Sequence, residues 1–331
     1  MHQKNSFSTL KAFSWLCLLS FLIGALYFLI SPFSVKPYEP VSPEKPQQLY
    51  SRLSLDAIDQ LFIDSLESLK KGRLYIFSLS ASNVWEKSLS SLKTKDFQIL
   101  YDKKYGQKIA RFPQENTLPY PKSYMMHCKI LTYDDQCCVI GSANLTPSSL
   151  KKDHNLVMSL YNPSLAKWLF NHFHNPKELT YIDDEIEFYM LPKNPLALTR
   201  LEKAIEEAKK TVQVAMFTFT HADLAKALAK AKKKGIDVEI ILEKRQAKSY
   251  SQKALNILKE SGIQARFLYS QEIMHHKFML VDHKQLSFGS CNWTNGAFNK
   301  NKDAFAIIQL NSENQRKMSK IWAQLKSLSS T

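Results

Sequence analysis

Two segments of the sequence carry the same reactive residues at the same spacing. Residues 127–144 read HCKILTYDDQCCVIGSAN and residues 275–292 read HHKFMLVDHKQLSFGSCN, so both follow the pattern HxKxxxxD-x6-GSxN. One copy could arise by chance, but two copies in register, about 150 residues apart, indicate a functional repeat. The repeated side chains are an imidazole, an ammonium, a carboxylate, a hydroxyl and an amide: His127, Lys129, Asp134, Ser142 and Asn144, then His275, Lys277, Asp282, Ser290 and Asn292.

The spacing of each motif predicts a strand that presents His and Lys on one face. Residues two apart in a strand point to the same side, and the Gly-Ser turn after the strand returns the hydroxyl and the amide towards it. If the two halves face each other, two imidazoles enclose one tetrahedral phosphate. Such a site suits in-line displacement, in which one neutral His attacks phosphorus and forms a phosphohistidine. The opposite, protonated His donates to the leaving oxygen and then acts as base for water.

The charges in the motif are suited to stabilising the transition state. Two lysines and two Asn amides would bind the non-bridging oxygens, a task that metal ions perform in other enzymes. No carboxylate cluster of the metal-binding type accompanies either motif. We therefore expect neither a metal nor another cofactor. His276 and His283 occupy no repeated position, so we expect no catalytic role for them.

The elements around the motifs also repeat. Residues 54–72 and 197–211 have helical apolar spacing, and each leads into a strand-like run, LYIFSLS and VQVAMFTFT respectively. A second strand follows in each half, at 97–102 and at 236–243, whereas residues 103–123 have no clear periodicity. This alternation predicts an α/β fold with two similar sandwich lobes, each a mixed sheet flanked by helices.

At the motif residues the sequence resembles the phospholipase D superfamily, whose HKD signature is this pattern, and the resemblance covers residues 50–331. It implies a phospholipase D/nuclease-like fold, phosphohistidine chemistry by His127 or His275, and supporting roles for Ser142 and Ser290. It also implies that four residues contact the phosphate: Lys129, Lys277, Asn144 and Asn292. For the two motif aspartates, Asp134 and Asp282, it implies a lesser, mainly structural role.

The family often places an acidic residue about eleven positions beyond the motif Asn, where it holds a catalytic imidazole. The second half has Asp303 there, while the first half reads Asp153-His154-Asn155, which leaves the equivalent position open. Family precedent favours His127 as nucleophile and His275 as acid, although the sequence does not separate the two.

The amino terminus predicts a membrane segment. Residues 12–30 are 19 predominantly apolar residues without a charge, enough for one helix to cross a bilayer. We expect an uncleaved anchor with the catalytic body on the non-cytoplasmic side, or a secreted protein if the segment is a cleaved signal. The predicted organisation is a membrane segment (1–36), a Pro-rich linker (37–50), a first lobe (51–185) and a second lobe (186–331).

The net charge of the chain indicates an anionic partner but does not distinguish a lipid from a nucleic acid. The net charge is +15, which favours anionic lipid head groups or nucleic acid. We expect hydrolysis of a phospholipid phosphodiester, and the alternatives are a nuclease, a phosphatidyltransferase such as a cardiolipin synthase, and an inactive lipid-binding adaptor. Because both motifs lie in one chain, a monomer suffices for one site. The five cysteines show no CxxC pair, so we expect buried thiols.

Overall fold

The computed structural model describes residues 38–80, 88, 91–106, 114–121, 123–174 and 177–331. The apolar run at 12–30 lies outside these residues, and so does Cys17. Among the described residues, no helix combines the length and apolar character that a bilayer crossing requires. All helices and strands below belong to one compact unit, residues 38–331.

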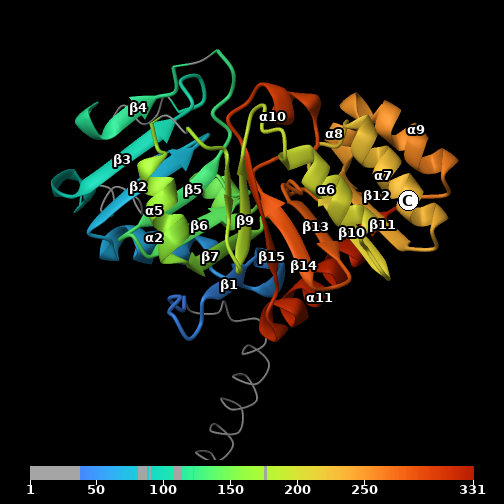
Figure 1. Ribbon diagram of the computed structural model, residues 1–331, viewed down its shortest axis with the longest axis horizontal. Coiled ribbons are helices and arrows are strands. Elements are labelled where there is room, and N and C mark those ends of the chain that lie inside the picture. Colours follow the sequence, from blue (N-terminus) through green and yellow to red (C-terminus); the bar gives the residue numbers. More distant parts are fainter. Residues whose placement is uncertain (1–37, 81–87, 89–90, 107–113, 122, 175–176) are drawn as a thin grey trace, which may run out of the picture. The chain divides into compact units, whose positions relative to one another are not determined.

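The first half of this unit folds around a mixed sheet (Figure 1). Within the described residues its strands follow the order β1-β7-β6-β5-β2-β3-β4, and only the pairs β2-β3 and β3-β4 are parallel. The strands are β1 (Gln47–Tyr50), β2 (Lys71–Ile76), β3 (Asp96–Tyr101), β4 (Thr117–Pro119), β5 (Lys129–Tyr133), β6 (Cys137–Gly141) and β7 (Val157–Tyr161).

The second half repeats that arrangement. Its described strands follow the order β16-β12-β11-β10-β13-β14-β15-β9-β8, which contains the first order with β9 in the place of β1. The strands are β8 (Thr180–Ile182), β9 (Ile186–Met190), β10 (Thr211–Met216), β11 (Asp237–Glu243), β12 (Arg266–Leu268), β13 (Lys277–Val281), β14 (Gln285–Gly289), β15 (Ala304–Gln309) and β16 (Ser329–Ser330).

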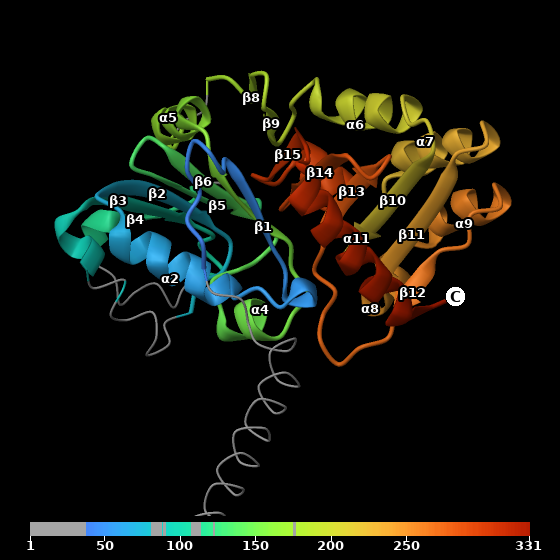
Figure 2. The ribbon, with the colours of Figure 1, turned by 90° about the horizontal axis from the view of Figure 1, so that it is seen from below.

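Helices cover both sheets and also fill the space between them (Figure 2). The described helices are α2 (Ile58–Ser68), α4 (Pro147–Lys151), α5 (Pro163–Asn171), α6 (Ala197–Glu206), α7 (Ala222–Lys233), α8 (Lys244–Tyr250), α9 (Gln252–Glu260), α10 (Asn295–Asn299) and α11 (Ser312–Ser327). The mixed α/β class with two helix-flanked sheets, predicted from the repeat, is confirmed.

Alternation along the strands divides the apolar residues among three cores. Leu74 and Ile76 of β2 pack with α2 on the outer face of the first sheet. Val212 and Val214 of β10 pack with α6 and α7 on the outer face of the second sheet. The inner faces of both sheets share a central core with α5 and α11, to which Tyr75, Ala215 and Trp322 belong, among others. The two halves are therefore held together by a continuous apolar interior.

α11 also joins the halves through polar contacts. The ammonium group of Lys317 donates to the backbone oxygen of Leu49 at 2.8 Å and lies 3.2 Å from the carboxylate of Asp56, with both charged side chains buried. Asn314 on the same helix donates to the backbone oxygen of Gln47. These contacts hold α11 of the second lobe against β1 and the residues that follow it.

The structure refines three expectations. Residues 103–123 were expected to be irregular, but they contain β4, a strand too short to show a period. The predicted linker at 37–50 ends in β1, because Gln47–Tyr50 pair with β7. The second sheet already begins at β8, ahead of residue 186. Four of the cysteines are described, and all are buried free thiols, as expected: Cys128, Cys137, Cys138 and Cys291.

Candidate active site

Both motif histidines line one cleft. This cleft has a volume of about 1050 Å³ and lies between the halves, at the carboxyl ends of β2 and β10. The first half contributes His127 and Asn144 to its wall, and the second half contributes His275 and Asn292. The fold therefore brings together two side chains that are about 150 residues apart in the sequence.

Each half supports the histidine of the other half. The backbone N–H of His127 donates to the carbonyl of Lys302 at 2.7 Å, and the N–H of His275 donates to the carbonyl of His154 at 2.9 Å. Two isolated β-bridges, Met126–Lys302 and His154–Met274, join the halves at the same places. Neither imidazole could be in place without the opposite lobe.

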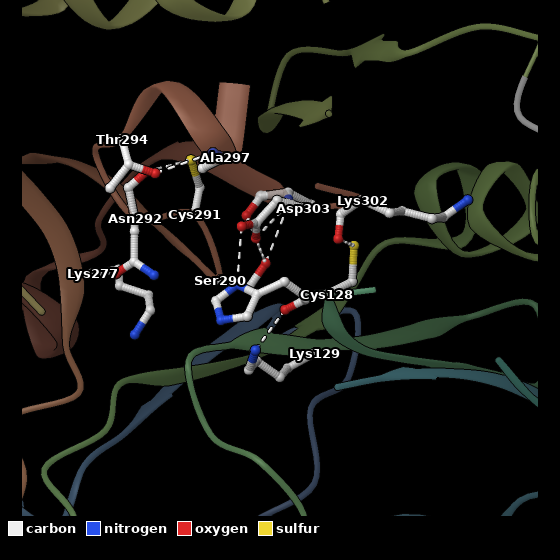
Figure 3. A network of polar contacts seen from close by, with 12 residues as sticks. Cys128, Lys129, Lys277, Ser290, Cys291, Asn292, Thr294, Ala297, Lys302 and Asp303 are labelled. Atoms are coloured by element: carbon white, nitrogen blue, oxygen red, sulfur yellow. Dashed lines mark hydrogen bonds and ion pairs between the residues drawn. The ribbon is translucent and has the colours of Figure 1, made fainter. Parts of the chain in front are cut away.

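The imidazoles are oriented by side chains that cross over in the same way. Nδ1 of His127 lies 2.9 Å from Oδ2 of Asp303, and Nδ1 of His275 lies 3.0 Å from Oδ1 of Asn155. Figure 3 shows Asp303 beside Ser290, whose hydroxyl donates to it. In the first half the hydroxyl of Ser142 donates to Asn155 at 2.8 Å. Because Nδ1 of each ring is occupied, Nε2 is the nitrogen left for a substrate.

The two motif serines therefore contact the orienting residues. Their placement depends on the glycine before each of them. A Cβ on Gly141 would lie 2.5 Å from the carbonyl oxygen of Leu156, and one on Gly289 would lie 2.5 Å from that of Ala304. Only glycine allows this close approach, which explains the Gly-Ser pair in both motifs.

The motif lysines are the first residues of β5 and β13, and neither is among the residues that line the cleft. Nζ of Lys129 donates to the carbonyl of His127 at 2.5 Å, and Nζ of Lys277 donates to that of His275 at 2.9 Å. Both lysines are 3% exposed, so their charges are largely removed from water. The amide oxygen of Asn292 accepts from the backbone N–H of Thr218 at 3.3 Å, which leaves its NH₂ group as a donor.

The motif aspartates do not line the cleft. Asp134 and Asp282 occupy the turn at the far end of the motif strand, about 17 Å from the lysine at 3.3 Å per residue. Asp134 accepts from the backbone N–H groups of Lys70 and Lys71, and Asp282 accepts from three such groups, at residues 209–211. Both residues have a positive φ, which Asp tolerates better than most residues. These contacts fasten the helix-to-strand connection.

Sequence reasoning missed a phenylalanine in each half. The ring of Phe77 lies 5.1 Å from that of His127, and the ring of Phe217 lies 4.9 Å from that of His275, both edge to face. The same rings lie under Lys129 and Lys277, at 5.0 and 4.7 Å from Nζ. The signal was present, since Phe77 directly follows β2 and Phe217 directly follows β10, but an apolar residue after a strand resembles ordinary core.

A comparison with models of protein families shows to which family the chain belongs. The model described as "Cardiolipin synthase, PLD-like domain" matches residues 81–176 and 201–326, which is more than half of the chain. This chain belongs to the phospholipase D superfamily. The match includes both copies of the motif.

Curated relatives from this superfamily match parts of the chain. The mitochondrial cardiolipin hydrolase of Mus musculus is 32% identical over 120 residues, which are 36% of this chain and 53% of that protein. The phospholipase D of Rickettsia typhi is 23% identical over 156 residues, 44% of this chain and 76% of that protein. The chain spans about half the length of the first of these relatives.

A solved structure shares the fold. The phosphatidylserine synthase of Haemophilus influenzae superposes with a TM-score of 0.68 and covers 89% of both chains at 12% identity. At that identity the likeness shows a shared fold alone.

The charges in this phospholipase D-type cleft are arranged to receive an anion. Burial lowers the pKa of Lys129 to about 8, although Asp303 opposes the shift. Burial, together with the nearby Lys129, lowers the pKa of Lys277 well below its usual range. Two buried cations close together repel each other, and a bound phosphodiester would relieve both the repulsion and the loss of hydration.

The two imidazoles are neutral at pH 7 for related reasons. Burial and then Lys129 lower the pKa of His127, against the raising effect of Asp303. Burial, followed by Lys277 and Lys129, holds the pKa of His275 well below its usual range. Asp303 keeps its charge because His127, Lys129 and Ser290 outweigh the effect of burial, which alone would raise its pKa.

Proposed function

We propose that this chain is a phosphodiesterase that cleaves a phospholipid by the phospholipase D reaction. The observation that carries the proposal is the pair of imidazoles in one cleft, each with Nδ1 bonded and Nε2 left for the substrate. Beside them lie two buried ammonium groups and the amide of Asn292. This set of groups can attack phosphorus, protonate a leaving oxygen and neutralise two phosphate oxygens.

In the first step Nε2 of His127 attacks phosphorus and forms a P–N bond. The bond from phosphorus to the head-group oxygen breaks, and the imidazolium of His275 donates its proton to that oxygen. The negative phosphodiester supports this protonation, because it opposes the lysine charges that lower the pKa of His275. The head group leaves as a neutral alcohol, and the rest of the lipid stays on His127.

In the second step His275, now neutral, takes a proton from water. The water oxygen attacks phosphorus, the P–N bond breaks, and a phosphomonoester leaves. His275 ends protonated and His127 ends neutral, so the cycle closes. Lys129 and Lys277 remain charged throughout and stabilise the additional negative charge of the transition state.

Exposed tyrosines that lie beside lysines favour a lipid surface. Tyr105, Tyr124 and Tyr269 are 46–51% exposed, and each lies beside a lysine, with distances from Nζ to the ring centre of 5.1, 5.9 and 3.7 Å. The lysines of these pairs are Lys104, Lys300 and Lys244. Lys104 and Tyr105 line the cleft. Tyrosine and lysine together suit the boundary between anionic head groups and acyl chains.

The curated relatives support a lipid as well, since their names are cardiolipin hydrolase and phospholipase D. Nucleic acid is the competing substrate, because tyrosines and lysines also bind single strands. A phosphatidyltransferase would use the same first step with an alcohol in the place of water. An inactive adaptor would bind lipid without turnover.

The test offers several substrates to the full chain in detergent. Vesicles of phosphatidylcholine alone, vesicles that also contain cardiolipin, and labelled single-stranded DNA are each incubated with a chelator present. We expect release of lipid head groups and intact DNA. Nicked DNA without lipid cleavage would assign a nuclease, and binding to vesicles without any product would overturn the enzymatic proposal. Added glycerol reveals a transferase through an exchanged head group.

A further inference from the structure

The residues that orient the two catalytic histidines are not the same. Asn155 and Asp303 occupy equivalent places, since each lies eleven positions beyond its motif asparagine and accepts from its motif serine. One is a neutral amide and the other is a carboxylate. The pseudo-symmetric halves therefore present different charges to the two rings.

The amide of Asn155 has only one orientation. Its NH₂ group donates to the carbonyl of Ser149 at 2.8 Å and to the hydroxyl of the same residue at 3.2 Å. A carbonyl can only accept, so the amide oxygen must face Ser142 and His275. The hydroxyl of Ser142 donates to that oxygen. Nδ1 of His275 consequently carries a hydrogen, and Nε2 is the nitrogen that gains and loses the proton.

His275 is bonded to no carboxylate among the described residues, and its surroundings disfavour a positive charge on its ring. Burial disfavours a positive ring most strongly, and four neighbours add to this effect: Lys277 and His276 from its own motif, and Lys129 and His127 from the opposite motif. Asp153 lines the same cleft, and burial raises the pKa of its carboxyl group. Asp303, the charged neighbour of His127, is 0% exposed and bonded to that ring. Asp303 is therefore the carboxylate that is bonded to a catalytic ring, and that ring belongs to His127.

We propose that Asn155 is a positioning residue that assigns the proton-transfer role to His275 by holding its ring with a neutral oxygen. The carboxylate of Asp303 leaves His127 as the nucleophile. The inference deepens the proposed function and rests on it, because it concerns the same two histidines.

The chemistry of the two steps explains why unlike partners help. A ring that is bonded to phosphorus at Nε2 and to hydrogen at Nδ1 is cationic, and a carboxylate beside it stabilises that intermediate. The acid must instead release its proton to the head-group oxygen in one step and recover a proton from water in the next. A carboxylate beside His275 would hold the proton and slow its release. An amide fixes the ring without adding this attraction.

The substitution Asn155→Asp tests the proposal, because it keeps the shape and adds the charge, although it also removes the two hydrogen bonds that the amide NH₂ donates to Ser149. In the wild type, turnover needs neutral His127 and protonated His275, so the pKa of His275 sets one of the two limbs of the pH profile of kcat/KM. We expect the variant to move this limb upward by about one to three pH units. A purely structural role would change activity or stability without moving the limb.

A second readout does not depend on turnover. With histidine labelled by ¹³C and ¹⁵N in the full chain, the protonation of His275 is followed by NMR in the absence of substrate. Asn155→Asp should raise the pKa of His275, whereas Asn299→Asp, which adds the same charge at an exposed position on α10, should leave it unchanged because water and salt screen that charge.

The two readouts separate the two claims. An unchanged pKa of His275 in Asn155→Asp overturns the inference even if the enzyme cleaves lipid. A raised pKa with no phosphodiesterase activity in the wild type upholds the control of protonation by Asn155 and overturns the proposed function. A raised pKa of His275 with both limbs of the pH profile unmoved overturns the assignment of proton transfer to His275.

Discussion

Nδ1 of His127 lies 2.9 Å from Oδ2 of Asp303, although the two residues are 176 positions apart in the chain. This bond makes the first motif dependent on the second lobe. We expect Asp303→Asn to keep the fold and to lower kcat by about 10²-fold or more, because the charged partner of the nucleophile is lost. The measurement is kcat with circular dichroism as a check on folding. Asp135→Asn, in the turn after β5 and paired with Lys71, is the matched control; equal activity of the two variants would refute the role of Asp303.

Lys129 contributes to activity at a cost to stability. Its burial lowers the pKa of the ammonium group to about 8, so Lys129→Met should abolish turnover and leave the folded protein as stable or more stable at pH 7. Between pH 8 and about 10.5 the folded wild type has released this proton while the unfolded chain still binds it. Its free energy of unfolding should therefore rise with pH over this range, by up to about 3 kcal/mol. Urea unfolding across the range tests this, and an equal rise in Lys129→Met would contradict it.

Asp282 accepts three backbone N–H groups far from the cleft. Asp282→Ala removes three hydrogen bonds, two of which are exposed so that water can replace them, and should lower the free energy of unfolding by about 1 kcal/mol. Below the melting temperature, kcat/KM should stay within about twofold of the wild type, since the change lies outside the reaction path. Thermal unfolding and kinetics on the same sample measure both effects. A large loss of kcat in a fully stable variant would place this aspartate in the chemistry.

His276 is 0% exposed, and neither of its ring nitrogens has a hydrogen-bond partner among the described residues. Burial, followed by His154 and Lys277, holds its pKa well below the usual value. The folded state thus keeps His276 neutral, while the unfolded chain protonates it below about pH 6.5. Stability should fall as the pH drops from 7 to 5, by about 1.4 kcal/mol per pH unit for each such histidine. His276→Leu should reduce the slope by one proton in urea titrations; an unchanged slope would contradict this account.

The repeat in the sequence predicted the fold well because both halves obey the same alternation. The strands at 97–102 and 236–243, for example, are β3 and β11 to within one residue. The repeat could not predict that Asp303 of the second lobe contacts His127 of the first, because a sequence pattern does not show which lobe a side chain contacts. β4 was missed because three residues, Thr117–Pro119, carry no measurable period. Asn155 was one of three adjacent candidates, and only its bond to His275 singled it out.

The most direct test of the two-histidine account is to trap the covalent intermediate. A phosphodiester with a p-nitrophenyl leaving group needs no proton from His275 to depart, so His275→Gln should release one equivalent of p-nitrophenolate and then stop. Alkaline quenching preserves the P–N bond, and peptide mass spectrometry locates it. We predict that the phosphoryl group is on His127, and that His127→Gln forms no adduct. An adduct on His275, or sustained turnover by His127→Gln, would contradict the account.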